Sequence, residues 1–162
     1  MPSTDWPGMT QLVKNLFASH WRRLHEDYSR LENGQYPGVY LLAYTTEDLE
    51  GKKVEEKDVF YVGMSHAGVK PRLRQFIDGL EKRRGHSGAM RFFTEYTGGR
   101  GYSKLSSKKT FFVTSISIRC SSGKKKRNAE DLRKMGQVAA LEYYVLAHIR
   151  EKLGREPELN KK

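Results

Sequence analysis

The apolar residues near the N-terminus recur at steps of three and four, which is the spacing typical of an amphipathic α-helix. The series begins at Met9 and continues to Leu31, and Asn33-Gly34 follows, two residues that tolerate the left-handed backbone found at helix ends. The pattern predicts one long helix from Met9 to about Glu32, preceded by a loose tail. We expect this helix to cover the sheet as a lid, with a contact between two copies of the chain as the alternative.

Three later segments have the apolar and aromatic composition of short buried strands. They span residues 38–44, 59–63 and 111–118, and the third alternates between its two faces with the period of a β-strand. The polar segment 45–58 between the first two is predicted to be a long loop. The strands therefore predict a small sheet.

Helical patterns occupy most of the remaining chain. One short helix is predicted to start near Pro71, and a final helix is predicted from about Ala129 to Lys152. Residues 86–96 are a further candidate helix, and 97–110 is predicted to be a loop.

The order of these elements predicts an α+β fold, a small three-stranded antiparallel or mixed sheet flanked by helices, with an additional N-terminal helix. We divide the chain into an N-terminal tail and helix, residues 1–34, and a main domain, residues 35–162.

Glu142 is the only charged residue in the apolar window 138–147. Helical spacing predicts that it shares a packed stripe with Leu132, Met135, Ala139, Leu146, Ile149 and Leu153. A carboxylate on a packed face costs free energy unless it is paired, protonated or bound to a metal. Glu142 is therefore a candidate cation ligand or general acid or base, and the alternative is a side chain that reaches solvent or pairs with one arginine.

The charge of the chain favours an anionic partner. Lys and Arg number 30 against 19 Asp and Glu, a net charge of +11, which attracts nucleic acid through counterion release. The single cysteine, Cys120, excludes a disulfide within the chain, and no segment has the length and hydropathy of a membrane span or the pattern of a secretory signal. We expect a cytoplasmic protein, or a nuclear one in a eukaryotic cell, with no membrane partner.

Five marks appear in order along the chain. Gly38-Val39-Tyr40 lies on the first strand and Tyr61-Val62-Gly63 on the second, Arg72 follows early in the next helix, Glu142 lies within the last helix, and Leu159-Asn160 comes after it. This series resembles the GIY-YIG nuclease family from about Pro37 to Asn160, although Arg74 offers a competing register for the arginine.

The resemblance implies an endonuclease that hydrolyses phosphodiester bonds in nucleic acid, with DNA as the expected substrate, and with Mg²⁺, or alternatively Mn²⁺, held by Glu142. Tyr40 and Tyr61 would line the cleft, and one of them would orient or deprotonate the attacking water. Arg72 would contact the scissile phosphate and Asn160 would shape the site. A cation and a guanidinium suit this reaction because its transition state concentrates negative charge on phosphate oxygens.

Two positions depart from the family pattern. The family often has His or Tyr one helical turn after the arginine, where this chain has Phe76, and some members have lysine where this chain has Met64. His86 is the catalytic candidate for the missing proton donor, because His86-Ser87-Gly88 resembles short polar motifs that follow this helix in some members, and His66 is the other option. For each, the alternative is an ordinary surface histidine. A non-catalytic nucleic-acid-binding module on the same fold is therefore the second hypothesis, and an interaction domain for an acidic protein is the third.

Basic residues cluster on three loops or helix ends and are candidates for phosphate contacts with double-stranded DNA. The candidate binding residues are Arg74, Arg83, Arg84, Arg100, Lys104, Lys108, Lys124 and Lys125. For each cluster the alternative is a solvated surface. The oligomeric state is not predicted.

Overall fold

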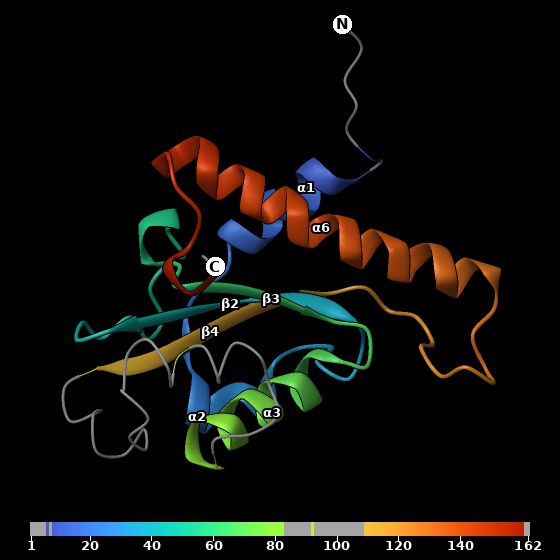
Figure 1. Ribbon diagram of the computed structural model, residues 1–162, viewed down its shortest axis with the longest axis horizontal. Coiled ribbons are helices and arrows are strands. Elements are labelled where there is room, and N and C mark those ends of the chain that lie inside the picture. The colour runs from blue at the N-terminus through green and yellow to red at the C-terminus, as the bar shows by residue number, and fades with distance from the viewer. Residues whose placement is uncertain (1–5, 7, 83–91, 93–108, 161–162) are drawn as a thin grey trace, which may run out of the picture.

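The computed structural model describes residues 6, 8–82, 92 and 109–160, and these form three layers (Figure 1). Helices α1 (Met9–Phe17) and α6 (Ala129–Leu153) cover one face of the central sheet, and α2 (Leu24–Asp27) and α3 (Val69–Lys82) lie on the other. The α+β class is therefore as expected. None of the helices in the described ranges is long and apolar enough to cross a membrane.

The sheet has four strands rather than the three expected from the sequence. They are antiparallel and lie in the order β1-β4-β2-β3, with bounds β1 (Arg22–Arg23), β2 (Gly38–Thr45), β3 (Tyr61–Ser65) and β4 (Thr110–Ser117). The β2 strand lies between β4 and β3, so that Tyr40 is opposite Gly63 on one side and Ser115 on the other. The β3 strand is an edge of the sheet.

Alternation along β2 divides the buried residues into two cores. Val39, Leu41 and Ala43 pack with residues of α1 and α6, whereas Tyr40 and Leu42 pack with residues of α3. Successive side chains of a strand point to opposite faces, which explains this division. Tyr40 thus lies on the α3 side of the sheet.

The long N-terminal helix predicted from Met9 to Glu32 is wrong, because α1 ends at Phe17. Beyond it the backbone pairs with a distant loop: the Trp21 amide donates to the Lys52 carbonyl at 2.9 Å, and the Val54 amide donates to the Ser19 carbonyl at 3.0 Å. The chain then joins β4 as β1, which is the strand missing from the prediction. Trp21 and Leu24 are nevertheless buried, so their spacing resembled that of a helix.

The final helix agrees with its prediction, and its ends are well defined. The Asn128 side chain accepts a hydrogen bond from the Asp131 amide, and the Asp131 carboxylate accepts one from the Asn128 amide, which forms a capping box. Gly154 ends the helix in the left-handed conformation, with φ 74°.

The expected buried stripe of α6 requires a correction. The buried residues of the helix are Val138, Leu141, Val145 and Ile149, whereas Leu132 is 51% exposed. The buried face is therefore rotated by about one residue relative to the prediction. Glu142 follows Leu141 and lies half-buried at the border of this face, not at its centre.

Candidate active site

Tyr40 lies at the centre of the candidate site and is fully buried. Its ring and hydroxyl lie over Gly63 of the edge strand, because a Cβ atom built on Gly63 would overlap the Tyr40 ring and hydroxyl. Any larger residue at position 63 would displace the phenol. A glycine opposite Tyr40 thus lets the side chain extend across β3 toward the edge of the sheet.

Three residues from other elements act on the Tyr40 phenol. The Tyr61 ring centroid is 6.2 Å from that of Tyr40, and the Arg72 guanidinium is within hydrogen-bond reach of the Tyr40 hydroxyl. Glu142 of α6 acts on the phenol through its charge. Burial raises the pKa of Tyr40 well above its ordinary value, Tyr61 and Glu142 add to the rise, and Arg72 opposes it. The structure therefore brings together the two phenols, the guanidinium and the carboxylate that the sequence singled out.

The position of β3 explains how helices from opposite layers reach one site. Arg72 is in the first turn of α3 on one side of the sheet, and Glu142 is near the middle of α6 on the other. Because β3 is an edge strand, side chains from both layers can meet beyond it without a strand between them. The site lies at this edge.

Glu142 is a half-buried carboxylate without an ion pair to any residue that the structure describes. Burial raises its pKa above the ordinary value of 4.5, and no neighbouring cation opposes the rise. A carboxylate held in this way favours a proton or a bound cation as its partner.

This donor set fits a weakly bound hard cation. Mg²⁺ is commonly held in proteins by one or two carboxylates with water as the other ligands. No group of three or more His, Cys, Asp and Glu that could hold a metal occurs among the described residues. Glu142 is the carboxylate of the candidate site that would hold such a cation.

Asn160 supports the site through the backbone of β3 rather than by contact with Tyr40. Its Oδ1 accepts a hydrogen bond from the Val62 amide at 2.8 Å, and its Nδ2 donates one to the Val62 carbonyl at 2.9 Å. The neighbouring Leu159 amide donates to the Phe60 carbonyl at 2.9 Å. The turn η4 (Glu158–Asn160) thus covers the outer edge of β3 immediately before Gly63.

Of the two arginines that competed for the phosphate position, Arg72 is the one at the site. It is half-buried beside Tyr40, whereas Arg74 is exposed. The Arg72 Nη1 donates a hydrogen bond to Gln75 Oε1 at 3.0 Å. Sequence reasoning missed Gln75, although its position three residues after Arg72 places the two on one face of a helix.

The two departures from the family pattern have structural consequences. Phe76 is fully buried, with its ring stacked on Tyr61 at a centroid distance of 6.4 Å, so this position supplies no proton donor. Met64 is half-buried and packs against the core. Of the two alternative donors, His66 is described and lies in the loop after β3, whereas His86 lies outside the described residues.

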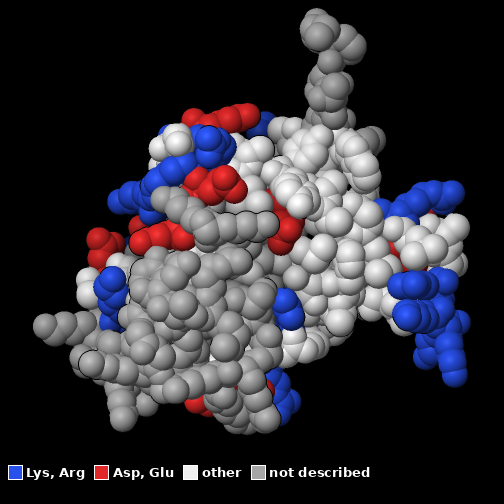
Figure 2. All heavy atoms as spheres, viewed as in Figure 1, with Lys and Arg blue, Asp and Glu red and all other residues white. Residues whose placement is uncertain are grey.

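The basic loop, residues 124–127, contains two of the predicted nucleic-acid-binding residues and lies within the part of the chain that the structure describes. Lys124 and Lys125 are exposed, and the loop projects at the end of the molecule where α6 begins (Figure 2). The predicted residues outside the described part of the chain are Arg83, Arg84, Arg100, Lys104 and Lys108.

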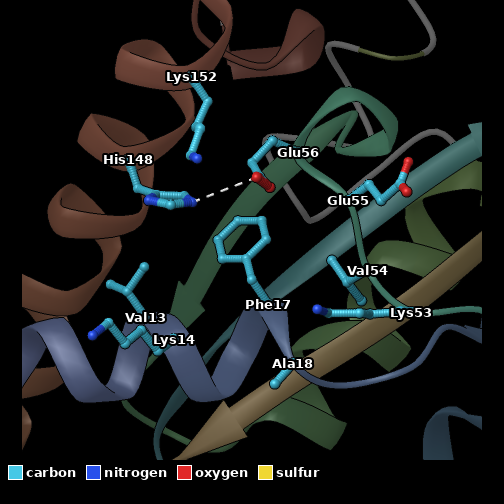
Figure 3. Close-up of a pocket in the computed structure, with 10 residues that line it drawn as sticks. All are labelled: Val13, Lys14, Phe17, Ala18, Lys53, Val54, Glu55, Glu56, His148 and Lys152. Atoms are coloured by element: carbon cyan, nitrogen blue, oxygen red, sulfur yellow. Dashed lines mark ion pairs between the residues drawn. The ribbon is translucent and has the colours of Figure 1, made fainter.

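A separate depression lies where α1 and α6 meet the turn η2 (Glu56–Asp58) (Figure 3). It contains a long ion pair, with His148 Nε2 at 3.8 Å from Glu56 Oε1, and the floor includes Phe17. None of the residues predicted to form the active site lines it.

Comparison of the chain with family models, curated proteins and solved structures gave no match.

Proposed function

We propose that this protein is a divalent-metal-dependent endonuclease that hydrolyses phosphodiester bonds in DNA. The observation that carries the proposal is the convergence of Tyr61, Arg72 and Glu142 on the buried Tyr40 phenol. The resemblance of these residues, in this order, to the GIY-YIG nucleases supports the same reaction. The net charge of +11 fits a polyanionic substrate.

Each residue has a role that follows from its surroundings. Arg72 binds the non-bridging oxygens of the scissile phosphate, where negative charge increases in the transition state. The Tyr40 phenol is protonated at neutral pH at its ordinary pKa, which burial raises further, and with Tyr61 it orients the attacking water. Glu142 would hold Mg²⁺, which supplies positive charge to stabilise the transition state.

Plasmid nicking tests the proposal. We expect the wild-type protein to nick supercoiled DNA in Mg²⁺ and to lose this activity in EDTA. Arg72→Ala and Glu142→Gln should each reduce the rate at least about 10²-fold, as for loss of a group that stabilises transition-state charge. Arg30→Ala and Glu151→Gln are the matched controls, because these side chains are exposed and lie outside the site.

Two results would contradict the proposal. Cutting that survives both substitutions would place the reaction elsewhere or assign it to a contaminant. A DNA gel shift without cutting, unaffected by Glu142→Gln, would instead identify a non-catalytic nucleic-acid-binding module.

A further inference from the structure

A surface depression adjoins the Tyr40 site at the start of α3. Arg72 and Gln75 line it from the helix, and Met64 and His66 line it from β3 and the loop that follows. Met64 directly follows Gly63, over which the Tyr40 ring lies, and Arg72 also reaches the Tyr40 hydroxyl. A phosphate bound by Arg72 in this depression would therefore have His66 as a neighbour.

The His66 ring is held by a contact with α6. Its Nε2 lies 3.2 Å from the carbonyl oxygen of Met135, and the ring is half-buried. A carbonyl oxygen only accepts hydrogen bonds, so Nε2 carries a hydrogen in both charge states of the imidazole. Nδ1 is therefore the nitrogen that gains and loses a proton, and the Met135 carbonyl fixes the ring that carries it.

From this geometry we infer that His66 is the general acid that protonates the leaving oxygen; the inference rests on the proposed nuclease activity. The attacking water forms the new P–O bond and releases one proton to solvent. The bond from phosphorus to the leaving oxygen breaks with its electron pair, and that oxygen takes the Nδ1 proton of the His66 imidazolium. Solvent then returns a proton to Nδ1.

Both helices packed against the loop contribute polar groups near His66. Arg72 of α3 is the charged residue that lines the same depression, and α6 contributes the neutral Met135 carbonyl. Glu142, the carboxylate of the candidate site, lies seven residues beyond Met135 on α6. The transition state carries more negative charge on its phosphate oxygens than the ground-state diester does. Arg72 and the His66 imidazolium can therefore bind the same transition state together.

His66→Gln is the decisive variant. The glutamine amide can keep a donor near the Met135 carbonyl but cannot give up a proton to a leaving oxygen. His148→Gln is the matched control, since His148 is also half-buried and paired but lies on α6 thirteen residues from Met135, about 20 Å along the helix axis. Thermal melting of both variants establishes that they are folded.

The measurements are the rate and pH profile of DNA cleavage in Mg²⁺, DNA affinity, and cleavage of a duplex with a bridging sulfur as the leaving atom. We expect His66→Gln to cut normal DNA about 10²-fold more slowly with unchanged DNA affinity. The wild-type rate should fall at high pH, where an imidazole no longer carries a proton to give, and this fall should be absent in His66→Gln. The sulfur substrate should restore most of the lost rate, because a thiolate leaves without a proton.

A normal rate and pH profile in folded His66→Gln, or a slow variant that the sulfur substrate does not rescue, would overturn the role of His66 while leaving the nuclease proposal intact. Absence of metal-dependent cutting by the wild-type protein would instead overturn the nuclease proposal, and the inference with it.

Discussion

At the scale of single residues, Glu142 combines partial burial with the lack of an ion pair to any described residue. Its raised pKa means that the folded protein binds this proton more tightly than the unfolded chain does. The contribution of Glu142 to folding stability is therefore most favourable at acidic pH. That contribution is lost as the pH rises from the ordinary carboxyl pKa of 4.5 through the raised pKa of Glu142 in the folded protein.

We therefore expect Glu142→Gln to stabilise the metal-free protein at neutral pH but not at pH 4. The gain should be no more than about 1 kcal/mol, because water screens a half-buried group. Thermal denaturation in EDTA at both pH values measures it, with the exposed Glu151→Gln as control.

Mg²⁺ should make the wild type more stable than Glu142→Gln at neutral pH, the reverse of the order expected in EDTA. A ligand that binds only the folded state raises its stability, so Mg²⁺ should raise the melting temperature of the wild type and not that of Glu142→Gln. Equal shifts in the two proteins would show that Glu142 is not the cation ligand.

At the scale of elements, the turn η4 stabilises the edge strand on which the site depends. Asn160→Ala removes both side-chain hydrogen bonds to Val62, and we expect a loss of about 1–3 kcal/mol. Urea denaturation measures the loss, and hydrogen exchange should accelerate at the Val62 amide. Glu158→Ala, in the same turn but exposed, should have little effect.

An Asn160→Ala protein as stable and as well protected as the Glu158→Ala protein would show that β3 does not need this support.

The sequence predicted those elements whose signals are local. The alternation at residues 111–118 defines its segment without reference to distant contacts. The helix predicted from about Ala129 to Lys152 is likewise bounded by local caps in the structure. The N-terminal segment was mispredicted because its helix ends where Ser19 and Trp21 form backbone hydrogen bonds with residues 52–54, a pairing that periodicity does not encode.

The candidate site also has some features that the sequence predicted and others that it did not. The residue types and order of Tyr40, Tyr61, Arg72 and Glu142 were visible in the sequence. The structure shows Tyr61 and Arg72 beside Tyr40 and Glu142 near enough to act on it electrostatically. The orientation of His66 was not predictable, because its partner is the backbone of a residue 69 positions away. The one-residue rotation of the buried face of α6 also escaped prediction, since apolar residues surround Glu142 on several sides.

At the scale of the whole molecule, the basic loop and the candidate site lie along one helix. Glu142 is thirteen residues from the start of α6, or about 20 Å along its axis. A duplex that spans this distance covers about six base pairs, at about 3.4 Å each. We therefore expect the loop to bind phosphates beside the proposed cleavage site rather than at it.

Replacing Lys124 and Lys125 together by alanine should weaken DNA binding. The slope of log K against log[salt] should become less steep by about 2, because two phosphate contacts are lost. Fluorescence anisotropy over a range of salt concentrations measures both. The double variant Lys14→Ala, Lys152→Ala removes the same charge from the depression shown in Figure 3 and is the control. Equal effects of the two double variants would indicate that only net charge matters.

The pairing of Asn160 with β3 also bears on the protein during its synthesis. Tyr40, Gly63 and Arg72 leave the ribosome long before Glu142 and Asn160 do. A nascent chain therefore presents the phenols and the guanidinium without the acidic residue, and its edge strand is not yet covered by η4. The pocket is therefore complete only after residue 160 has been synthesised, so the acidic residue and the turn η4 join the site last.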